Sequence, residues 1–178
     1  MGRLPEIDEA LLAAEQRAIY EKLKSQRGHV RGPFAVWLRN PELCQHTLDL
    51  QEMFASRVKL ERRLLELMIL VAARSANAQY AWFIHEPHAL GIASETVKAI
   101  RERRTPDFSR EDECLVYDIT LDLNNTRQLS ETIYRRGMEL FGEEVMVELV
   151  SAIGFYSMVA MTLNGFHVTV PDGSNPLP

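Results

Sequence analysis

The most constraining feature of this sequence is an apolar run from Leu64 to Ala73, which reads LLELMILVAA. A helix with this sequence presents apolar side chains on every face, so other parts of the chain must surround it. The run therefore predicts a buried central helix over about residues 59 to 74. Glu66 is the only charged residue within it. A buried carboxylate without a partner is strongly unfavourable, so the fold must supply Glu66 with one.

A second helix, expected after a break in the chain, carries the candidate partner of Glu66. One face of this helix repeats at i, i+3, i+4 and i+7 through Ala78, Ala81, Trp82 and His85. If this face packs against the central helix, the carboxylate and the imidazole meet in a mostly apolar pocket. A histidine oriented by a carboxylate is suited to proton transfer, which makes Glu66 and His85 candidate catalytic residues.

Two other interpretations of Glu66 stay open at this point. The pair with His85 can be a structural ion pair that fixes packing without doing chemistry. Arg62 lies one helical turn before Glu66 and is an alternative partner for the carboxylate. In that case His85 would lose its orienting group.

Turn-forming and capping residues divide the rest of the chain into further helices. The expected N-cap residues are Asn40, Ser94 and Ser109, and Ser130 begins a further helix. Besides the central helix, helices are expected over about residues 7–23, 41–54, 78–90, 94–104, 109–124, 130–142 and 143–166. We find no convincing strand pair and no repeat of fixed period, so the chain is predicted to be all-α. At 178 residues it is long enough for one domain with a single core.

The residues from Glu66 to His85 resemble the carboxymuconolactone decarboxylase family, which includes the alkylhydroperoxidase D branch. In that branch a glutamate precedes by nineteen residues the histidine of a Cys-x-x-Cys-x-x-x-His motif, and Glu66 and His85 have this spacing. The two cysteine positions are occupied here by Ala78 and Ala81. Other branches carry a motif like C-x-Y-E-W-x-x-H, of which this chain retains the tyrosine, the tryptophan and the histidine.

The resemblance continues after the histidine, where Gly91 and the segment SETVKAI are similar to the glycine turn and capped helix of the same family. It spans about residues 32 to 101 and is looser over the C-terminal helices. It implies an alkylhydroperoxidase D-like helical bundle in a single domain. On this basis residues 1–31 form an N-terminal helix and connector, residues 32–167 the family-like helical domain, and residues 168–178 a C-terminal tail.

The loss of both motif cysteines argues against the peroxidase chemistry of the cysteine branch. That chemistry uses one thiolate to attack the peroxide and a second cysteine to resolve the sulfenic acid. The chain has only Cys44 and Cys114, which lie seventy residues apart and show no redox or metal-ligand spacing. Alanines at the motif positions either leave room beside His85 for an organic substrate or water, or let the helices pack closely.

The resemblance places Glu66 and His85 at the positions of the family's proton relay. Our first hypothesis is therefore a cofactor-free, metal-free lyase or isomerase that acts on a small carbonyl, lactone or aromatic-derived acid. His85 would move the proton and Glu66 would orient the imidazole. The second hypothesis is a non-catalytic helical oligomer that binds a small ligand or a partner, because one fold can host many functions.

Five further residues are candidates for binding the substrate. Trp82 shares the face of His85 and is expected to wall an apolar site together with Phe34 or Trp37. Arg74, at the turn between the two helices, either meets an anionic group of the substrate or is simply a polar turn residue. The Tyr80 hydroxyl bonds either to a substrate or to a neighbouring helix. All the aromatic candidates also suit plain core packing.

Two histidines at i and i+3, His85 and His88, raise the question of a metal site. A pair of histidines needs at least one further ligand, and the sequence shows no pattern that supplies it. We therefore expect neither a metal nor another cofactor.

The net charge limits the classes of binding partner, and the cysteines indicate the cellular compartment. A formal net charge of −5 and a pI near 5.6 argue against nucleic acid or an anionic membrane as the partner. Residues 145–163 approach membrane-spanning length, but Glu148 and several small residues favour a core helix. The spacing of Cys44 and Cys114 favours reduced thiols over a disulfide bridge, which stays an alternative. Together with the lack of an apolar signal segment, this predicts a cytoplasmic protein. The resemblance implies a homo-oligomer, a trimer or a multiple, that buries part of the segment MVELVSAIGFYSMVAMTL.

Overall fold

The computed structural model describes residues 2–178, and within that range the chain is helical without strands. The α-helices are α1 (Ala14–Arg27), α2 (Pro33–Trp37), α3 (Pro41–Ser56), α4 (Arg62–Ser75), α5 (Gln79–His85), α6 (Ser94–Arg101), α7 (Glu111–Thr126) and α8 (Glu131–Gly165). Two short 3-10 helices are η1 (Glu9–Leu11) and η2 (Glu86–His88). The all-α prediction is confirmed.

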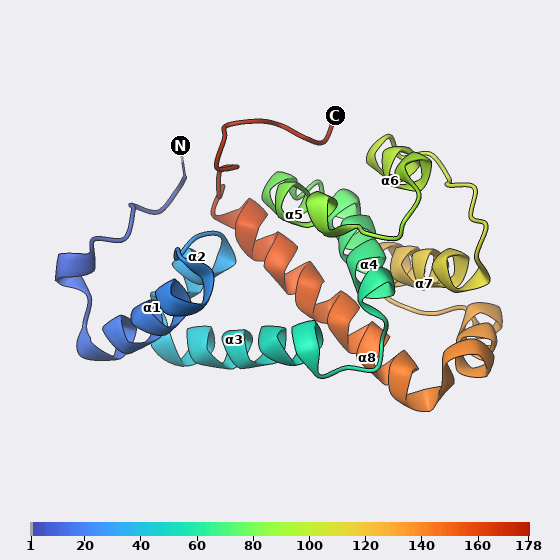
Figure 1. The fold of residues 1–178 in the computed structure, drawn as a ribbon, viewed down its shortest axis with the longest axis horizontal. Helices are drawn as coiled ribbons and strands as arrows, with labels where there is room; N and C mark the ends of the chain where they lie inside the picture. Colours follow the sequence, from blue (N-terminus) through green and yellow to red (C-terminus); the bar gives the residue numbers. More distant parts are fainter. Residues whose placement is uncertain (1) are drawn as a thin grey trace.

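Helix α4 is the centre of the fold, as its apolar sequence predicts. Every residue from Leu64 to Arg74 is buried, Glu66 included. The helix contacts α5, α6, α7 and α8, which surround it on all sides (Figure 1). The hydrophobic run therefore has the environment that it requires.

The N-terminal helices α1, α2 and α3 pack together on one side of α8, while α4 to α7 lie on its other side (Figure 1). Aromatic rings line the contact, with Phe155 of α8 at 5.6 Å from Phe54 and 6.4 Å from Trp37, measured between ring centroids. The Trp37 indole N–H also donates to the Thr162 hydroxyl at 3.2 Å. This arrangement leaves the space between α5 and the N-terminal helices for a site.

Helix α8 consists of two helical segments that meet at Gly142, where φ is 74° and ψ is 172°. The two helices expected over residues 130–142 and 143–166 therefore join at the predicted break, because glycine tolerates a positive φ. By length and composition alone α8 could span a membrane. A core helix of a soluble protein passes the same test, and α8 packs against α2, α4, α5 and α7.

The structure confirms one of the three predicted caps, that of Asn40, and shows that Ser130, the predicted start of a helix, is also a cap. The side chains of Asn40 and Ser130 accept hydrogen bonds from backbone N–H groups three residues later, at 3.1 Å and 3.3 Å. The predictions for Ser94 and Ser109 are wrong. Ser94 is already the first residue of α6, and α7 starts after Arg110. The first turn of α7 is acidic instead. Its negative charges interact favourably with the positive end of the helix dipole, so they stabilise this end without a side-chain cap.

Two further expectations about the ends of segments need correction. The helix expected over residues 78–90 ends at His85, because Pro87 has no N–H to continue the α-helical hydrogen bonding and a 3-10 turn follows. The C-terminal tail, expected to be extended or loose, is held against α5. Gln79 and Leu177 exchange two hydrogen bonds, at 3.0 Å and 2.8 Å, and Leu177 is buried.

Candidate active site

The predicted contact between Glu66 and His85 is present in the structure. Glu66 lies in the first half of α4 and is fully buried, and His85 is the last residue of α5. The distance between His85 Nδ1 and Glu66 Oε2 is 2.8 Å. A break of three residues between the helices turns the chain back on itself, so α5 packs along α4 and brings the imidazole to the carboxylate.

Arg62 contacts the same carboxylate through its other oxygen. The guanidinium forms an ion pair with Glu66 Oε1, although the geometry is not that of an aligned hydrogen bond. The two candidate partners of Glu66 therefore do not exclude each other, because the carboxylate has two oxygens and uses one for each. His85 keeps its orienting group.

This arrangement assigns the roles of the two imidazole nitrogens. A carboxylate can only accept a hydrogen bond, so Nδ1 carries the proton that it donates to Glu66. In the neutral ring Nε2 then holds a lone pair. Nε2 makes no hydrogen bond to any of residues 2–178, and the side chain keeps 19% of its surface exposed. His85 therefore presents a free basic nitrogen.

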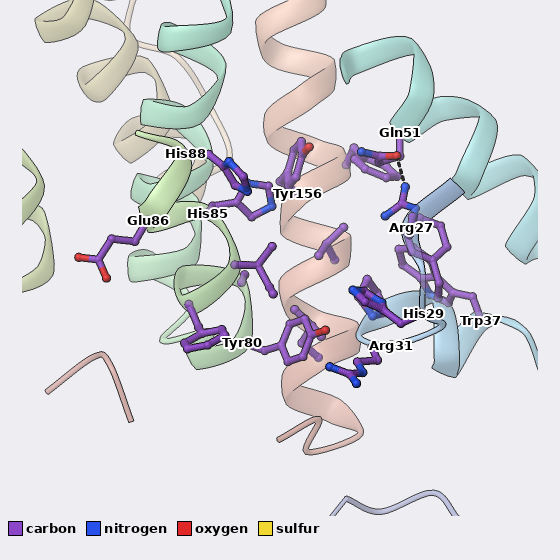
Figure 2. A pocket seen from close by; sticks show the side chains of 18 of the residues that line it. Arg27, His29, Arg31, Trp37, Gln51, Tyr80, His85, Glu86, His88 and Tyr156 are labelled. Carbon is purple, nitrogen blue, oxygen red and sulfur yellow. Dashed lines mark hydrogen bonds between the residues drawn. The ribbon is translucent and has the colours of Figure 1, made fainter. Parts of the chain in front are cut away.

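His85 opens onto a cavity of about 530 Å³ between α5 and the N-terminal helices (Figure 2). This volume suits a small organic molecule. The apolar part of the wall comes from Leu23, Pro33, Phe34, Trp37, Ala81, Phe83, Ile84, Pro87, Phe155, Val159 and Leu163. The polar part comes from Arg27, His29, Arg31, Gln51, Tyr80, His85, Glu86, His88 and Tyr156.

Three of the five predicted substrate-binding residues line this cavity. Phe34 and Trp37 form part of the apolar wall, and their rings meet edge to face at 5.4 Å between centroids. Tyr80 lines the cavity from α5. Burial raises the pKa of the Tyr80 phenol, so it remains a hydrogen-bond donor at neutral pH. Ala81, at a motif cysteine position, also lies in the wall and leaves room there.

Trp82 does not line the cavity, which corrects the expectation that it walls the site. The side chain is fully buried in the core, with the Arg101 guanidinium at 5.7 Å from its ring centroid. Successive residues of a helix turn by about 100°, so Trp82 points away from the side of α5 that carries Tyr80 and Ile84. His85 lies between these two sides and reaches both Glu66 and the cavity.

Arg74 is also absent from the cavity wall. It lies eight residues after Glu66 on α4, which is about 12 Å along the helix axis. The guanidinium is bonded to the Asn77 side chain, and burial lowers the pKa of Arg74. The structure therefore supports the alternative interpretation, in which Arg74 belongs to the turn between α4 and α5.

Sequence reasoning missed Tyr156, which lies on α8 beside His85. The two rings meet edge to face, with centroids 5.7 Å apart. Burial raises the pKa of the Tyr156 phenol well above its usual range, so the hydroxyl stays protonated. No side-chain hydrogen bond within residues 2–178 involves the Tyr156 hydroxyl, and the residue lines the cavity. In the sequence Tyr156 stands inside an apolar helix, where nothing distinguishes it from a core residue.

The histidines and acidic residues do not form a metal-binding cluster in the part of the chain that the structure describes. Within residues 2–178 no three His, Cys, Asp or Glu side chains converge on one point. His88 lies in the cavity wall near His85, on η2, and Glu86 next to it forms an ion pair with Arg101 of α6.

Comparison with known proteins was informative only at the level of three-dimensional structure. No protein-family model and no curated protein matches the sequence. An uncharacterized peroxidase-related protein from Silicibacter sp. TM1040 superposes with a TM-score of 0.75 at 14% identity, over 94% of this chain and 91% of that chain. A second such protein, from Ralstonia eutropha JMP134 and described as an alkylhydroperoxidase AhpD core, gives 0.73 at 13% identity, over 99% and 97%.

The chain has the alkylhydroperoxidase D fold. The fold predicted from the Glu66 to His85 motif is thereby confirmed. A further structure with this fold is the debrominase Bmp8 in complex with 2,3,4-tribromopyrrole, with a TM-score of 0.71 at 15% identity, over 96% of this chain and 91% of that chain. Proteins of this fold thus include peroxidase-related proteins and a debrominase, and identities this low establish the fold alone.

Proposed function

We propose that this protein is an enzyme that moves protons on a small organic substrate, with His85 as the acid/base and Glu66 as its orienting group. One observation carries the proposal. A fully buried carboxylate holds one nitrogen of His85 at 2.8 Å, while the other nitrogen is free at the edge of a cavity. A base of this kind must reach its proton and keep a defined tautomer, and this geometry supplies both.

The chemistry that fits this site is that of a lyase or an isomerase. In an isomerisation, Nε2 of His85 takes a proton from a carbon next to a carbonyl and returns it to another carbon of the same molecule. In a decarboxylation, loss of CO2 leaves an electron pair on carbon, and the imidazolium delivers the proton to it. The Tyr156 ring lies beside His85 and lines the cavity, which supports a role for its hydroxyl as hydrogen-bond donor to the oxygen on which negative charge develops. Neither reaction needs an oxidant or a reductant.

The walls of the cavity support a small, flat substrate. Phe34, Trp37 and Phe155 contribute aromatic surface, and the volume of about 530 Å³ suits a molecule of one or two rings. A debrominase of the same fold binds 2,3,4-tribromopyrrole, a flat ring of this size class. These features support the predicted substrate class of small carbonyls, lactones and aromatic-derived acids.

Thiol peroxidase chemistry finds no support at this site. Both cysteines are free, and neither lines the cavity. Burial raises the pKa of Cys44 to about 11, so its thiol is protonated at neutral pH. Burial also raises the pKa of Cys114, on α7. Since the thiolate is the reactive form, these environments oppose attack on a peroxide.

The cytoplasmic location and the homo-oligomer remain part of the proposal. Exposed apolar side chains on the outer side of α8, among them Val147, Val150 and Met161, support burial of this face between subunits. Light scattering coupled to size-exclusion chromatography tests the assembly. A monomer at micromolar concentration would contradict it.

The decisive experiment is a turnover screen of wild type, His85→Ala and His88→Ala on lactones, β-keto acids and hydroxylated aromatic carbonyls. Hydrogen peroxide with a thiol reductant is included as a further substrate. His88 lines the same cavity without contacting Glu66, so it is the matched control. We expect one organic class to turn over, roughly a 1000-fold loss in His85→Ala, and little change in His88→Ala.

Two outcomes would contradict the proposal. The first is the absence of turnover of every substrate by correctly folded wild type, which would favour the non-catalytic, ligand-binding oligomer. The second is an equal loss in both histidine variants with circular dichroism unchanged, which would remove the special role of the Glu66 contact.

A further inference from the structure

The wall of the cavity across from His85 is basic. Arg27 is the last residue of α1, and His29 and Arg31 follow in the connector to α2. Figure 2 shows these three side chains on the opposite side of the pocket from His85 and His88, with Tyr156 between the two sides. The cavity therefore combines a proton-transfer group at one side with positive charge at the other.

Neither arginine of this wall has a carboxylate partner among residues 2–178. Arg62, Arg63 and Arg101, by contrast, each form an ion pair with an acid. The side-chain hydrogen bond of Arg27 goes to the neutral amide of Gln51, and Arg31 forms no side-chain hydrogen bond within the described range. Glu52 lies near enough to Arg27 to favour its charged form, but it forms no ion pair with it.

The acidic residue Glu86 also lines the cavity, but it does not offset the positive charge of Arg27 and Arg31. It lies in the cavity wall on η2, on the side of His85, and the Arg101 guanidinium neutralises it. The cavity wall contains no other aspartate or glutamate. An anion that enters the cavity thus meets two unpaired guanidinium groups and no unpaired acid.

Arg27 is held in place for contact with a ligand. Its guanidinium lies 4.5 Å from the centroid of the Phe34 ring and bonds to Gln51 on α3. The residue as a whole is exposed, but these two contacts fix the planar group at the cavity edge. A planar guanidinium fixed in this way suits the two oxygens of a carboxylate.

The path of the connector fixes the location of Arg31. Gly32 has a φ of +63°, and a Cβ atom there would lie 2.7 Å from the Tyr80 ring. The backbone therefore crosses directly over Tyr80, and only glycine combines this conformation with so close an approach. Arg31, the preceding residue, is thereby held at the rim of the cavity, beside Tyr80.

We propose that the basic wall with Arg27 and Arg31 binds a carboxylate, so that the substrate of this cavity is a small, flat organic acid. This inference rests on the proposed function and narrows its substrate class from neutral or acidic molecules to acids alone. The two arginines lie apart on the wall with His29 between them (Figure 2), so the carboxylate binds at one of them. The ring lies against Phe34 and Trp37, and the reacting atoms face His85 and Tyr156.

The test is the binding of benzoate and of its neutral isostere benzamide, measured by calorimetry. The variants are Arg27→Gln, Arg31→Gln and Arg135→Gln, since Arg135 is an exposed arginine of α8 outside the cavity. We expect wild type to bind benzoate at least roughly tenfold more tightly than benzamide, because a charged hydrogen-bond pair is lost with the amide. One of the two cavity variants should reduce this preference to about threefold or less, and Arg135→Gln should leave it unchanged.

The controls separate this inference from the proposed reaction. His85→Ala should keep the preference for benzoate, so the subsite stands even if the turnover screen fails. Arg27→Lys keeps the charge and should retain part of the preference, which distinguishes lost binding from lost folding. Equal affinity of wild type for both probes, no binding of either probe, or unchanged preference in both cavity variants would overturn the subsite. Competition by inorganic phosphate as strong as that by benzoate would overturn the assignment to an aromatic acid.

Discussion

Two neighbouring arginines of α4, Arg62 and Arg63, each meet buried carboxylates on different sides of the helix. Arg62 contacts Glu66, whose side chain has no exposed surface. Arg63 contacts Asp112 and Glu113 of α7, at 2.6 Å and 2.5 Å, and all three side chains are at most 17% exposed. Both clusters pair an arginine of α4 with a carboxylate of little or no exposed surface, although Arg62 is itself more exposed than Arg63.

They differ in what completes each cluster. The cluster around Arg63 is closed by further charges, because Arg110 also pairs with Asp112, and none of its members lines the cavity. In the other cluster Glu66 contacts His85. The second nitrogen of His85 has no hydrogen-bond partner within residues 2–178, and the residue lines the cavity. A buried ion pair therefore does not mark an active site by itself. What distinguishes a candidate active site is a titratable group that contacts the buried charge and also faces a cavity for a substrate.

The largest effect that we expect from this comparison is a loss of stability in the cluster around Arg63, which we call the closed cluster. Arg63→Met leaves Asp112 and the nearly buried Glu113 short of a positive partner, so the free energy of unfolding should fall by about 3 kcal/mol. Urea denaturation measures it. Arg135→Met, at an exposed pair on α8, should change stability by less than about 0.5 kcal/mol. A comparable loss of turnover in folded Arg63→Met would contradict the assignment of this cluster to structure alone.

Glu66→Gln tests the cluster of Arg62, Glu66 and His85, which we call the open cluster. The amide keeps the size of the side chain but cannot stabilise the imidazolium, so kcat/KM should fall roughly 100-fold, or about 2.7 kcal/mol in activation free energy. Glu113→Gln is the matched control, because Glu113 is also a nearly buried carboxylate next to an arginine of α4. It should lower stability and leave kcat/KM within roughly twofold. If both variants lose activity alike, the distinction between the clusters fails.

Acid should weaken the closed cluster in a defined pH window. The guanidinium groups of Arg110 and Arg63 hold the pKa of Asp112 at about 2, against 3.8 for an isolated aspartate. A carboxyl with a depressed folded-state pKa stabilises the protein above its unfolded-state pKa, and this stability is lost as pH falls through the folded-state value. Between pH 4 and pH 2, Asp112 should therefore account for a loss of about 2 kcal/mol. Asp112→Asn should be less stable at neutral pH and should lose less on acidification, and parallel curves for the two proteins would contradict this.

The smallest effect concerns a single hydrogen bond at the open site. Tyr156→Phe removes the hydroxyl beside His85 and keeps the ring, so kcat should fall roughly tenfold with little change in stability. Tyr134→Phe, at an exposed tyrosine on the same helix, is the control and should have no effect. A loss of stability in Tyr156→Phe that matches its loss of rate would show that the hydroxyl supports packing instead.

Local patterns were sufficient to predict the central helix, the cap at Asn40, the start of a helix at Ser130, and the contact between Glu66 and His85. Each of these depends on residues that are close in the chain or on a spacing that two packed helices convert into a contact. Trp82 was assigned to the cavity from its helical spacing to His85, and that step failed. A helical face is wide enough for two residues of the same face to point to different neighbours. The prediction for Arg74 failed because its position next to the turn in the sequence does not bring its side chain close to His85.

The sequence by itself determined that α4 must be buried and that Glu66 needs a partner, because apolar periodicity and the cost of a buried charge are local properties. Only the tertiary structure decided what faces His85. Arg27 and Tyr156 come from α1 and α8, more than fifty residues away from His85 in either direction. They reach the cavity because the N-terminal helices and α5 both pack against α8, and contacts between such distant elements leave no pattern in the chain.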